Sequence, residues 1–253
     1  MSAILVPYHL DQHLPGLAVP VATEASITAD LPEGDPWQRM AALYERVAAA
    51  VADAVGGGGP VTVVSGDCTT SLGTVCGLQR AGLDPSIVWL DAHGDVQTLE
   101  TTASGYLGGL PLRILVGYRP ELIADRLGLS AVAEERVVLV DARDLDPPEA
   151  EYLARAAIRR STVGDVSAAT LPDGPVYLHL DLDVVDSGEL PGLLFPAPGG
   201  PPASAVGAAV RRLLATGRVA AFGVGCTWRQ EHSADAAERV RPHLASALNA
   251  WNG

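Results

Sequence analysis

Closely spaced aspartate, histidine and cysteine residues occur in three short segments of the chain. The segments are Ser65–Thr70 (SGDCTT), Asp91–Asp95 (DAHGD) and His179–Asp186 (HLDLDVVD). Each lies at the carboxyl end of an apolar run that predicts a β-strand. Carboxylate oxygens combined with a single imidazole favour a hard or borderline divalent ion such as manganese. The three segments therefore predict a metal site.

The spacing within the segments predicts two ions. On a strand, residues i and i+2 face the same side, so Asp91 and His93 should point together, as should Asp181 and Asp183. Carboxylates crowded into one crevice repel one another and raise each other's pKa values. A pair of divalent cations would remove this repulsion.

Each segment by itself also has a structural interpretation. A single Asp-x-Asp after a strand commonly caps a loop, and His93 alone would more often be a structural histidine. Cys68 alone would more often be a small buried hydrophobe, as we expect for Cys76 and Cys226. Three such segments in one chain are difficult to explain in this way, and together they favour the metal centre.

The elements that must position these residues alternate along the chain. The predicted strands are Ala3–Val6, Val61–Ser65, Ile87–Asp91, Val137–Asp141, Val176–Asp181 and Val219–Val224. The predicted helices are Pro36–Val55, Thr69–Arg80, Pro111–Val116, Pro148–Arg160, Pro202–Leu214 and Ala234–Ala250. This alternation predicts one domain over residues 1–253, an α/β fold with three layers (α/β/α) around a mainly parallel, doubly wound sheet. Ligands bind outside the carboxyl ends of such strands, where the three segments lie.

Composition excludes several classes of partner. The net charge is -13 without a Lys/Arg cluster, so we expect no nucleic-acid partner, because phosphate binding needs a basic surface. No apolar run reaches the roughly 18 residues of a membrane span, so we expect no membrane partner. Three cysteines without a framework spacing predict reduced thiols and a cytoplasmic location.

The three segments, in this order, resemble the arginase/agmatinase family of ureohydrolases. The family pattern is Gly-Gly-Asp-His-Ser, then Asp-Ala-His-x-Asp, then Ser-x-Asp-x-Asp-x-x-Asp. Thr101–Pro111 (TTASGYLGGLP) is similar to the family's substrate loop, and Arg143–Pro147 (RDLDP) to the arginase segment that helps bind an α-amino group. The resemblance implies hydrolysis of a C–N bond in a guanidino or amidino molecule, which is small and nitrogen-rich. It further implies attack by a hydroxide that bridges two Mn²⁺, and a homo-oligomer.

The resemblance also implies roles for individual residues. The implied ligands of one metal are Cys68, Asp91, Asp95 and Asp181. The implied ligands of the other metal are Asp91, His93, Asp181 and Asp183. Asp95 would hydrogen-bond the hydroxide as a catalytic residue, and the implied substrate-binding residues are Gln97, Ser104 and Asp146.

Cys68 and Gly108 depart from the family pattern. Cys68 stands where the family has a metal-binding histidine, so either its sulfur softens the site and admits Zn²⁺ or Fe²⁺, or it does not ligate. Gly108 stands where arginases have a histidine thought to shuttle protons. His179 is a candidate catalytic substitute for it, with a packing role in the sheet as the alternative.

Further departures concern the substrate. Gly225 replaces the glutamate that pairs with guanidinium, and Glu231 or another acid of its loop is a candidate replacement. Gln97 replaces an asparagine that helps hold an α-carboxylate. Cys68 together with the segment Tyr106–Gly109 is similar to a branch that hydrolyses Nω-hydroxyarginine. N-hydroxylation lowers the basicity of a guanidine, which suits a site without a full carboxylate clamp. That branch keeps an acidic residue where this chain has Gly225, so the match is partial.

Two alternative functions stay open from the sequence. The departures at Cys68, Gly108 and Gly225 also fit a metal-binding relative that has lost activity. Asp181–Val185 (DLDVV) resembles the motif of phosphatases with an aspartyl nucleophile. That motif normally follows the first strand of its fold, whereas here it lies late in the chain, and the segment Asp91–Asp95 would be unexplained.

Overall fold

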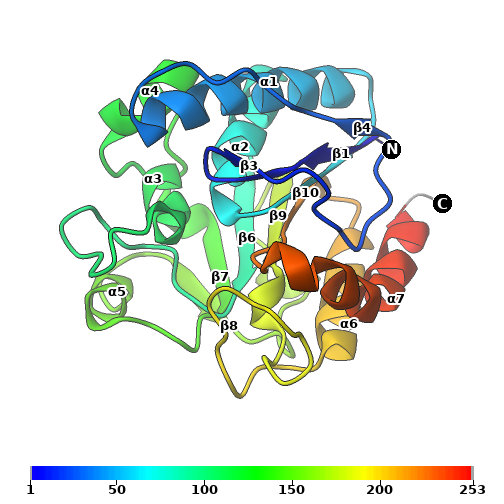
Figure 1. Ribbon diagram of the computed structural model, residues 1–253. Helices are drawn as coiled ribbons and strands as arrows, with labels where there is room; N and C mark the ends of the chain where they lie inside the picture. The colour runs from blue at the N-terminus through cyan, green and yellow to red at the C-terminus, as the bar shows by residue number, and fades with distance from the viewer. Residues whose placement is uncertain (1, 252–253) are drawn as a thin grey trace.

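A parallel β-sheet forms the middle layer of the computed structural model, which describes residues 2–251 (Figure 1). Within this range the sheet has eight strands. Their order is β4 (Ala25–Ser26), β1 (Ser2–Val6), β5 (Val61–Ser65), β10 (Val219–Gly225), β9 (Val176–Asp181), β6 (Ser86–Asp91), β7 (Val137–Asp141) and β8 (Arg159–Ser161). Every pairing in it is parallel. A short antiparallel hairpin, β2 (Tyr8–His9) with β3 (Gln12–His13), lies beside β1.

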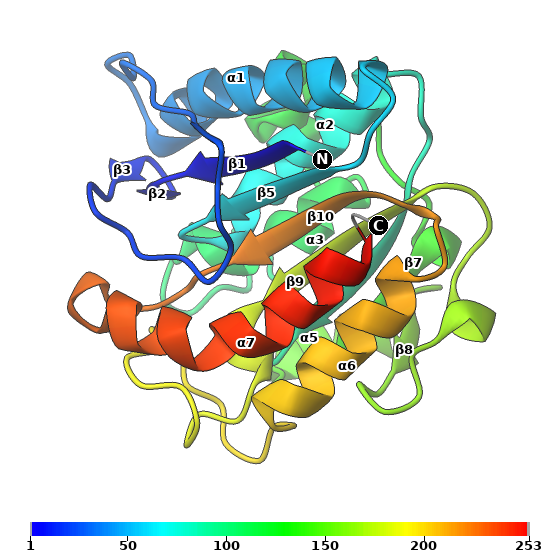
Figure 2. The same cartoon turned by 90° about the vertical axis from the view of Figure 1, so that its right-hand side faces the viewer.

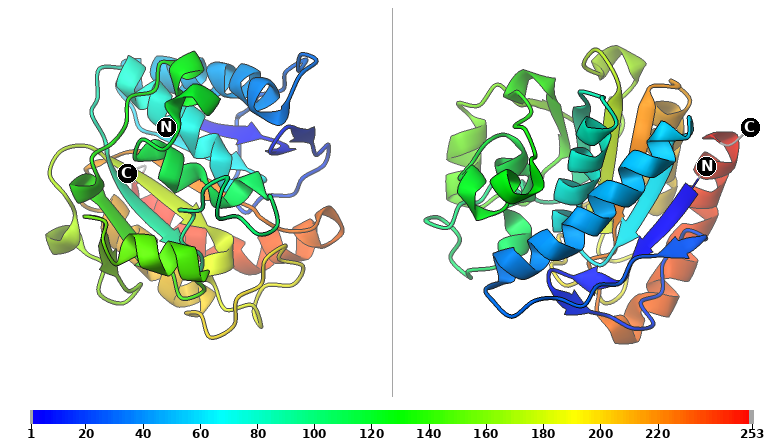
Figure 3. Two further views of the ribbon diagram at one scale, coloured as in Figure 1. Left: turned by 90° about the vertical axis from the view of Figure 1, so that its left-hand side faces the viewer. Right: turned by 90° about the horizontal axis from the view of Figure 1, so that it is seen from above.

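Helices cover both faces of the sheet. The helices whose apolar residues share one core are α1 (Pro36–Gly56), α2 (Ser71–Arg80), α3 (Pro111–Leu115), α4 (Ala124–Leu127) and α5 (Pro147–Leu153). The opposite core contains α6 (Ala203–Leu214) and α7 (Ser233–Trp251). Figure 2 shows α1 and α2 above the sheet and α6 with α7 in front of it, and Figure 3 shows the layers from two other sides. The predicted three-layer α/β/α fold is confirmed.

Short 3₁₀ turns connect the larger elements, several of them next to the carboxyl edge of the sheet. They are η1 (Cys68–Thr70), η2 (Leu107–Gly109), η3 (Pro120–Leu122), η4 (Glu134–Arg136), η5 (Ala168–Thr170), η6 (Leu182–Val184) and η7 (Gln230–His232).

Burial on both faces explains the strand composition. Every residue of β6 and β9 is buried, and both strands are nearly continuous apolar runs that end in an aspartate. Strands covered on both faces need apolar residues at most positions. The aspartate that ends each strand lies at the edge of the sheet, where it can reach the site. The hydrophobic pattern therefore delivers the aspartates to one edge.

Most element boundaries agree with the sequence prediction, and one helix does not. The predicted strands match within one residue at either end, and Asp35 caps α1 by accepting a hydrogen bond from the Gln38 amide at 3.0 Å. The helix predicted over Pro148–Arg160 was wrong in extent, because α5 ends at Leu153. Arg159–Ser161 instead pairs with β7 as the edge strand β8. This tertiary pairing overrides the local pattern.

The strand order brings the central strands of the site together. β5, β10, β9 and β6 are consecutive neighbours in the sheet. Gly225 of β10 pairs with Ser65 of β5 on one side and with Asp181 of β9 on the other. The carboxyl ends of these four strands therefore lie side by side. Among residues 2–251, no helix has the length and apolar character needed to cross a membrane.

Candidate metal centre and its pocket

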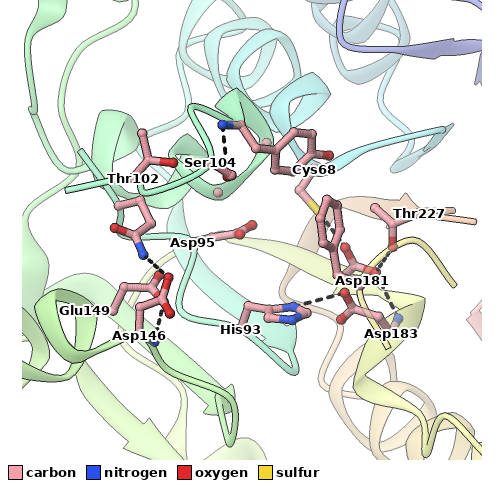
Figure 4. A pocket seen from close by; sticks show the side chains of 15 residues that line it. Cys68, His93, Asp95, Thr102, Ser104, Asp146, Glu149, Asp181, Asp183 and Thr227 are labelled. Carbon is pink, nitrogen blue, oxygen red and sulfur yellow. Dashed lines mark hydrogen bonds and ion pairs between the residues drawn. The ribbon is translucent and has the colours of Figure 1, made fainter. Parts of the chain in front are cut away.

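Two groups of potential metal ligands lie at the carboxyl edge of the four central strands. The first group is Cys68, Asp91 and Asp181, and the second is Asp91, His93 and Asp183. In each group one ligand atom per residue lies within 4.8 Å of the others. Asp91 belongs to both groups, which places them next to each other. The three sequence segments predicted to form the site are thus brought together (Figure 4).

The first group is completely buried and internally hydrogen-bonded. The Cys68 thiol donates to Asp181 Oδ2 at 2.8 Å, and the Thr227 hydroxyl donates to Asp181 Oδ1 at 2.6 Å. Burial and the nearby Asp181 raise the pKa of the Cys68 thiol, so the thiol keeps its proton in this arrangement. A metal bound here would have to replace that proton. Thr227, which the sequence analysis did not identify, lies two residues after the end of β10.

The second group contains an ion pair. His93 Nδ1 lies 3.1 Å from Asp183 Oδ2 and 3.4 Å from Asp91 Oδ1. Burial by itself would lower the pKa of His93, but the two carboxylates outweigh it and raise this pKa to about 12. Burial and the charge of Asp91 raise the pKa of Asp183 to about 7. The imidazolium stands between the carboxylates where a cation could bind.

Hydrogen bonds within local turns orient the side chains of Asp91 and Asp181. Asp91 Oδ1 accepts the His93 amide at 2.7 Å, and Asp181 Oδ1 accepts the Asp183 amide at 2.9 Å. Both strands have ended at these aspartates, and Asp183 lies in the 3₁₀ turn η6. Asp91 and His93 therefore point together, as do Asp181 and Asp183. The cause is the hydrogen bonds in these turns rather than the alternation of side chains along a strand.

Asp95 is buried next to the ligand groups but belongs to neither of them. Its backbone has a φ of 53°, a left-handed conformation that is uncommon for a residue with a side chain. Its Oδ2 atom has no hydrogen-bond partner among the described residues. Figure 4 shows its carboxylate pointing toward the side of the pocket where Cys68 and Asp181 lie. A buried carboxylate oxygen without a partner is costly unless a ligand or an ion satisfies it.

The charge balance of the site fits divalent cations. Burial, together with Asp91 and Asp181, raises the pKa of Asp95. Burial, together with Asp183 and Asp91, raises the pKa of Asp181. The carboxylates therefore destabilise one another's charged forms, and only His93 supplies a positive charge among the ligand groups. Oxygen-rich donors with one imidazole suit Mn²⁺, and the thiol is a softer donor suited to Zn²⁺ or Fe²⁺.

A cavity of about 150 Å³ opens above the ligand groups. Its lining comprises Cys68, His93, Asp95, Gln97, Thr102, Ser104, Tyr106, Gly108, Gly109, Asp146, Glu149, Asp181, Asp183, Phe195 and Thr227. Within residues 2–251, this lining contains no lysine or arginine. The cavity is small and strongly acidic, so it suits a small cationic or neutral polar molecule.

The three predicted substrate-binding residues lie on the wall of this cavity. The Gln97 amide donates to Asp146 Oδ2 at 2.7 Å, and the Ser104 hydroxyl accepts the Tyr106 amide at 3.2 Å. The wall also contains the buried Glu149, which the sequence analysis missed. Its carboxylate accepts the Asp146 and Val96 amides, each at 3.2 Å. The Asp146-x-x-Glu149 spacing of a helix-capping box was the signal that could have identified it.

Arg143 fixes the loop that follows η6. Its guanidinium donates to the carbonyls of Asp183 at 3.2 Å, Val184 at 3.0 Å and Ala197 at 2.9 Å. These contacts hold the loop 186–202 beside the pocket. The loop also places Phe195, which is 40% exposed, on the pocket wall.

His179 lies outside the cavity wall. Its ring stacks on Trp89 with the centroids 3.7 Å apart, and Nδ1 is 2.9 Å from the Tyr177 hydroxyl. Burial lowers its pKa to about 3, so the ring is neutral. This position supports a packing role for His179 over a catalytic one. Trp89 in turn donates to Asp91 Oδ2 at 3.0 Å.

Glu231 does not replace the carboxylate absent at Gly225. It is exposed on η7 and does not line the cavity. A Cβ atom at residue 225 would lie 3.0 Å from Cys68 Sγ and 3.6 Å from Asp181 Oδ2. A side chain at this position would therefore project directly beside the first ligand group.

Comparisons with known proteins agree with this geometry. The arginase family model matches residues 6–226. The chain is 32% identical over 146 residues to the N(omega)-hydroxy-L-arginine amidinohydrolase of Streptomyces lavendulae, covering 56% of this chain and 52% of that protein. It is also 32% identical over 176 residues to the arginase of Bacillus caldovelox, covering 64% and 58%. The chain thus spans about half the length of the curated relatives it matches.

Solved structures share the fold over nearly the whole chain. The crystal structure of arginase from Bacillus cereus has a TM-score of 0.81 at 23% identity, covering 100% of this chain and 98% of that one. The native arginase structure from Bacillus caldovelox has a TM-score of 0.77 at 25% identity, covering 96% and 97%.

Proposed function

Because the chain belongs to the arginase family, we propose that it is a metal-dependent hydrolase that cleaves a C–N bond in a small guanidino or amidino molecule. The observation that carries this proposal is the pair of largely buried ligand groups that share Asp91 and lie beneath an acidic cavity. A phosphatase with an aspartyl nucleophile is no longer a competing function, since the family match accounts for all three segments. We also propose that residues 1–253 form one domain.

We propose two Mn²⁺ sites in this centre. The group Cys68, Asp91 and Asp181 would hold one ion, and the group Asp91, His93 and Asp183 the other. The family resemblance adds Asp95 as a ligand of the first ion and Asp181 as a shared ligand of the second. When bound, the two ions supply Lewis acidity and activate the water that attacks the amidino carbon. For His93 and Cys68 to act as ligands, each must give up the proton that it carries in the metal-free arrangement.

The other residues would orient the substrate. Asp95 Oδ2 is buried and free to accept a hydrogen bond from the attacking water. Asp146 and Glu149 place carboxylates at the opposite wall, where they would bind an α-ammonium group, with Gln97 and Ser104 supplying neutral polar atoms beside it.

We further propose an Nω-hydroxyarginine-like substrate. With glycine at residue 225 and Glu231 outside the cavity, a strongly basic guanidinium would lack its carboxylate clamp. A hydroxyguanidine is a weaker base and depends less on such a clamp. The name of the Streptomyces lavendulae relative supports the same class of substrate. A cytoplasmic location and a homo-oligomer remain predictions from the sequence.

Metal stoichiometry and turnover test the proposal together. The protein would be dialysed against chelator, reconstituted with Mn²⁺, and assayed with arginine, Nω-hydroxyarginine, agmatine and formimino compounds. We expect about two ions per chain and fastest turnover of the hydroxyguanidine. Asp183→Asn should lose one ion and at least about a hundredfold in kcat/KM, because it removes a charged ligand.

Asp186→Asn is the matched control. Asp186 lies in the same segment, accepts the Gly188 and Gly200 amides, and does not line the cavity. This variant should keep both ions and its turnover. Two bound ions without turnover of any compound would favour a metal-binding relative that has lost activity. Full metal content in Asp183→Asn would contradict the ligand assignment.

A further inference from the structure

The phenol ring of Tyr106 fills the space that a side chain at residue 108 would need. A Cβ atom built on Gly108 would lie well under 3.0 Å from the Cζ and Oη atoms of Tyr106, a separation that real Cβ atoms do not show. Both residues line the cavity above Cys68 and Asp95. The glycine at 108 and the tyrosine at 106 are therefore one structural feature, in which a phenol hydroxyl occupies the place of another side chain.

The Tyr106 ring is held by two neighbours. Its hydroxyl lies 3.1 Å from His9 Nε2, and the two rings stack with centroids 5.7 Å apart. Phe195 packs against the ring at a centroid distance of 4.7 Å. His9 comes from the hairpin β2–β3, Tyr106 from the loop before η2, and Phe195 from the loop after η6. Three separate segments thus converge to position a single phenol.

The second nitrogen of His9 determines the direction of the hydrogen bond. His9 Nδ1 lies 3.0 Å from the carbonyl oxygen of Gly66. A carbonyl oxygen only accepts, so Nδ1 must carry a proton, and Nε2 of the neutral ring is then an acceptor. With the His9 ring neutral, Tyr106 donates its hydroxyl proton to His9 Nε2. Burial raises the pKa of Tyr106, so the hydroxyl stays neutral. The free lone pairs of Oη can accept a hydrogen bond.

We propose that Tyr106, oriented by His9, accepts a hydrogen bond from an N–H or N–OH group of the bound amidino group and so determines substrate preference. This inference rests on the proposed function. A neutral oxygen acceptor matches a weakly basic hydroxyguanidine, and it complements the absence of a carboxylate at Gly225. Tyr106 would contact the substrate, whereas His9 is a positioning residue that acts through it.

Deleting the hydroxyl alone tests the inference. Tyr106→Phe keeps the ring, its packing on Phe195 and the filled space at Gly108. We expect a tenfold to hundredfold loss, as an order of magnitude, in kcat/KM for the hydroxyguanidine substrate, mainly through KM. The Kd of hydroxyguanidine, measured by calorimetry on the Mn²⁺-reconstituted protein, should rise by a similar factor. Tyr152→Phe deletes a phenol hydroxyl outside the cavity and should change neither value.

The role of His9 predicts a specific non-additivity. His9→Ala should weaken binding less than Tyr106→Phe does, and the double variant should be no weaker than Tyr106→Phe alone. His9→Gln supplies an amide oxygen that can accept from Tyr106, so it should restore most of the binding. Additive losses in the double variant would overturn the positioning role, since a purely structural effect of His9 would persist without the hydroxyl.

The steric part of the inference has its own variant pair. Gly108→Ala should displace Tyr106 and weaken hydroxyguanidine binding as much as Tyr106→Phe does. The same change made in a Tyr106→Ala background should have no further effect, because the space is then open. Equal losses from Gly108→Ala in both backgrounds would overturn the steric coupling.

These measurements separate the inference from the proposed function. Equal turnover of hydroxyguanidine substrates by the wild-type protein and by Tyr106→Phe would overturn the inference and leave the proposed function intact. A Tyr106-dependent Kd in a protein without turnover would support the inference and contradict the hydrolase. Failure of the wild-type protein to bind hydroxyguanidine would overturn the inference.

Discussion

The thiol of Cys68 sets the protonation requirement of the first ligand group. It donates to Asp181 Oδ2 at 2.8 Å and is buried against a floor of carboxylates, so a metal must displace its proton. If Cys68 binds as a thiolate, it and the four proposed aspartate ligands together carry five negative charges. Two divalent ions neutralise only four of them. This excess should weaken the Lewis acidity of the ions and make the attacking water ionise less readily.

Cys68→His should therefore raise the affinity for Mn²⁺. The pKa of a free imidazole, about 6.5, lies below that of a free thiol, about 8.5, so its proton is displaced at lower cost, and each pKa unit is worth about tenfold in affinity. A competition titration against a fluorescent chelator would measure the change, with Cys68→Ala as the variant lacking any ligand. Identical Mn²⁺ affinity in wild type, Cys68→His and Cys68→Ala would mean that the cysteine is not a ligand.

His179 makes stability depend on pH. Its folded-state pKa is about 3, whereas an unfolded histidine has a pKa of about 6.5. Above pH 6.5 the ring is neutral in both states, and its contribution does not change. As the pH falls from 6.5 toward 3, only the unfolded chain takes up the proton. The free energy of unfolding should therefore fall by about 1.4 kcal/mol per pH unit from this group.

Urea unfolding of metal-free wild type and His179→Gln between pH 4 and pH 8 would isolate this contribution. The other titrating groups are common to both proteins, so the difference between the curves reports on residue 179. The variant should show the shallower fall below pH 6.5, while the slopes should agree above pH 7. Parallel curves across the whole range would rule out a buried neutral histidine.

Contact between α1 and α2 depends on glycine at the interface. A Cβ atom at Gly77 of α2 would lie 2.6 Å from both the Ala48 carbonyl oxygen and the Val51 Cβ of α1. The helices pack closely because this position has no side chain. α2 follows η1, which places Cys68 in the pocket, so the packing of the helix pair supports the first ligand group from behind.

Gly77→Ala should lower the free energy of unfolding by about 1–3 kcal/mol, because the added methyl group forces the two helices apart. Gly56→Ala is the matched control. Gly56 is the last residue of α1, and a Cβ atom there meets nothing within 4 Å. Its replacement should be neutral or stabilising by up to about 1 kcal/mol. Denaturant unfolding would measure both, and equal effects of the two changes would contradict close packing at Gly77.

At the scale of the whole molecule, repulsion between the buried carboxylates of the site destabilises the folded state. The chain has a net charge of -13, and four aspartates of the site are buried within one edge of the sheet. Bound cations should therefore stabilise the fold as well as supply chemistry. A ligand that binds only the folded state stabilises it by about 2.7 kcal/mol at a concentration of 100 Kd.

Mn²⁺ at that concentration should raise the Tm of the metal-free protein by about 5–10 °C for each site filled, given the usual shift for a chain of this size. Differential scanning calorimetry with and without Mn²⁺ would measure it. Asp183→Asn should show a smaller shift than wild type. A Tm that is independent of Mn²⁺ would contradict metal binding by the folded protein.

The sequence by itself determined the layers of the fold and the edge of the sheet at which the candidate metal centre lies. Nearly continuous apolar runs predict strands covered on both faces, and most of the polar residues then follow where those strands end. Asp91, Asp181 and Cys68 were therefore expected at one edge of the sheet, and the strand order then placed them close together. Local patterns of this kind are visible in a single stretch of chain.

Only the tertiary structure decided which other residues join them. The position of β10 between β5 and β9 brings Thr227 to Asp181, although 46 residues separate them. The same packing seats His179 on Trp89 outside the cavity and leaves Glu231 on the surface. The filling of the space at Gly108 by Tyr106 likewise depends on His9, which lies 97 residues from the tyrosine. Such contacts follow from strand order and side-chain volume, and no local pattern encodes them.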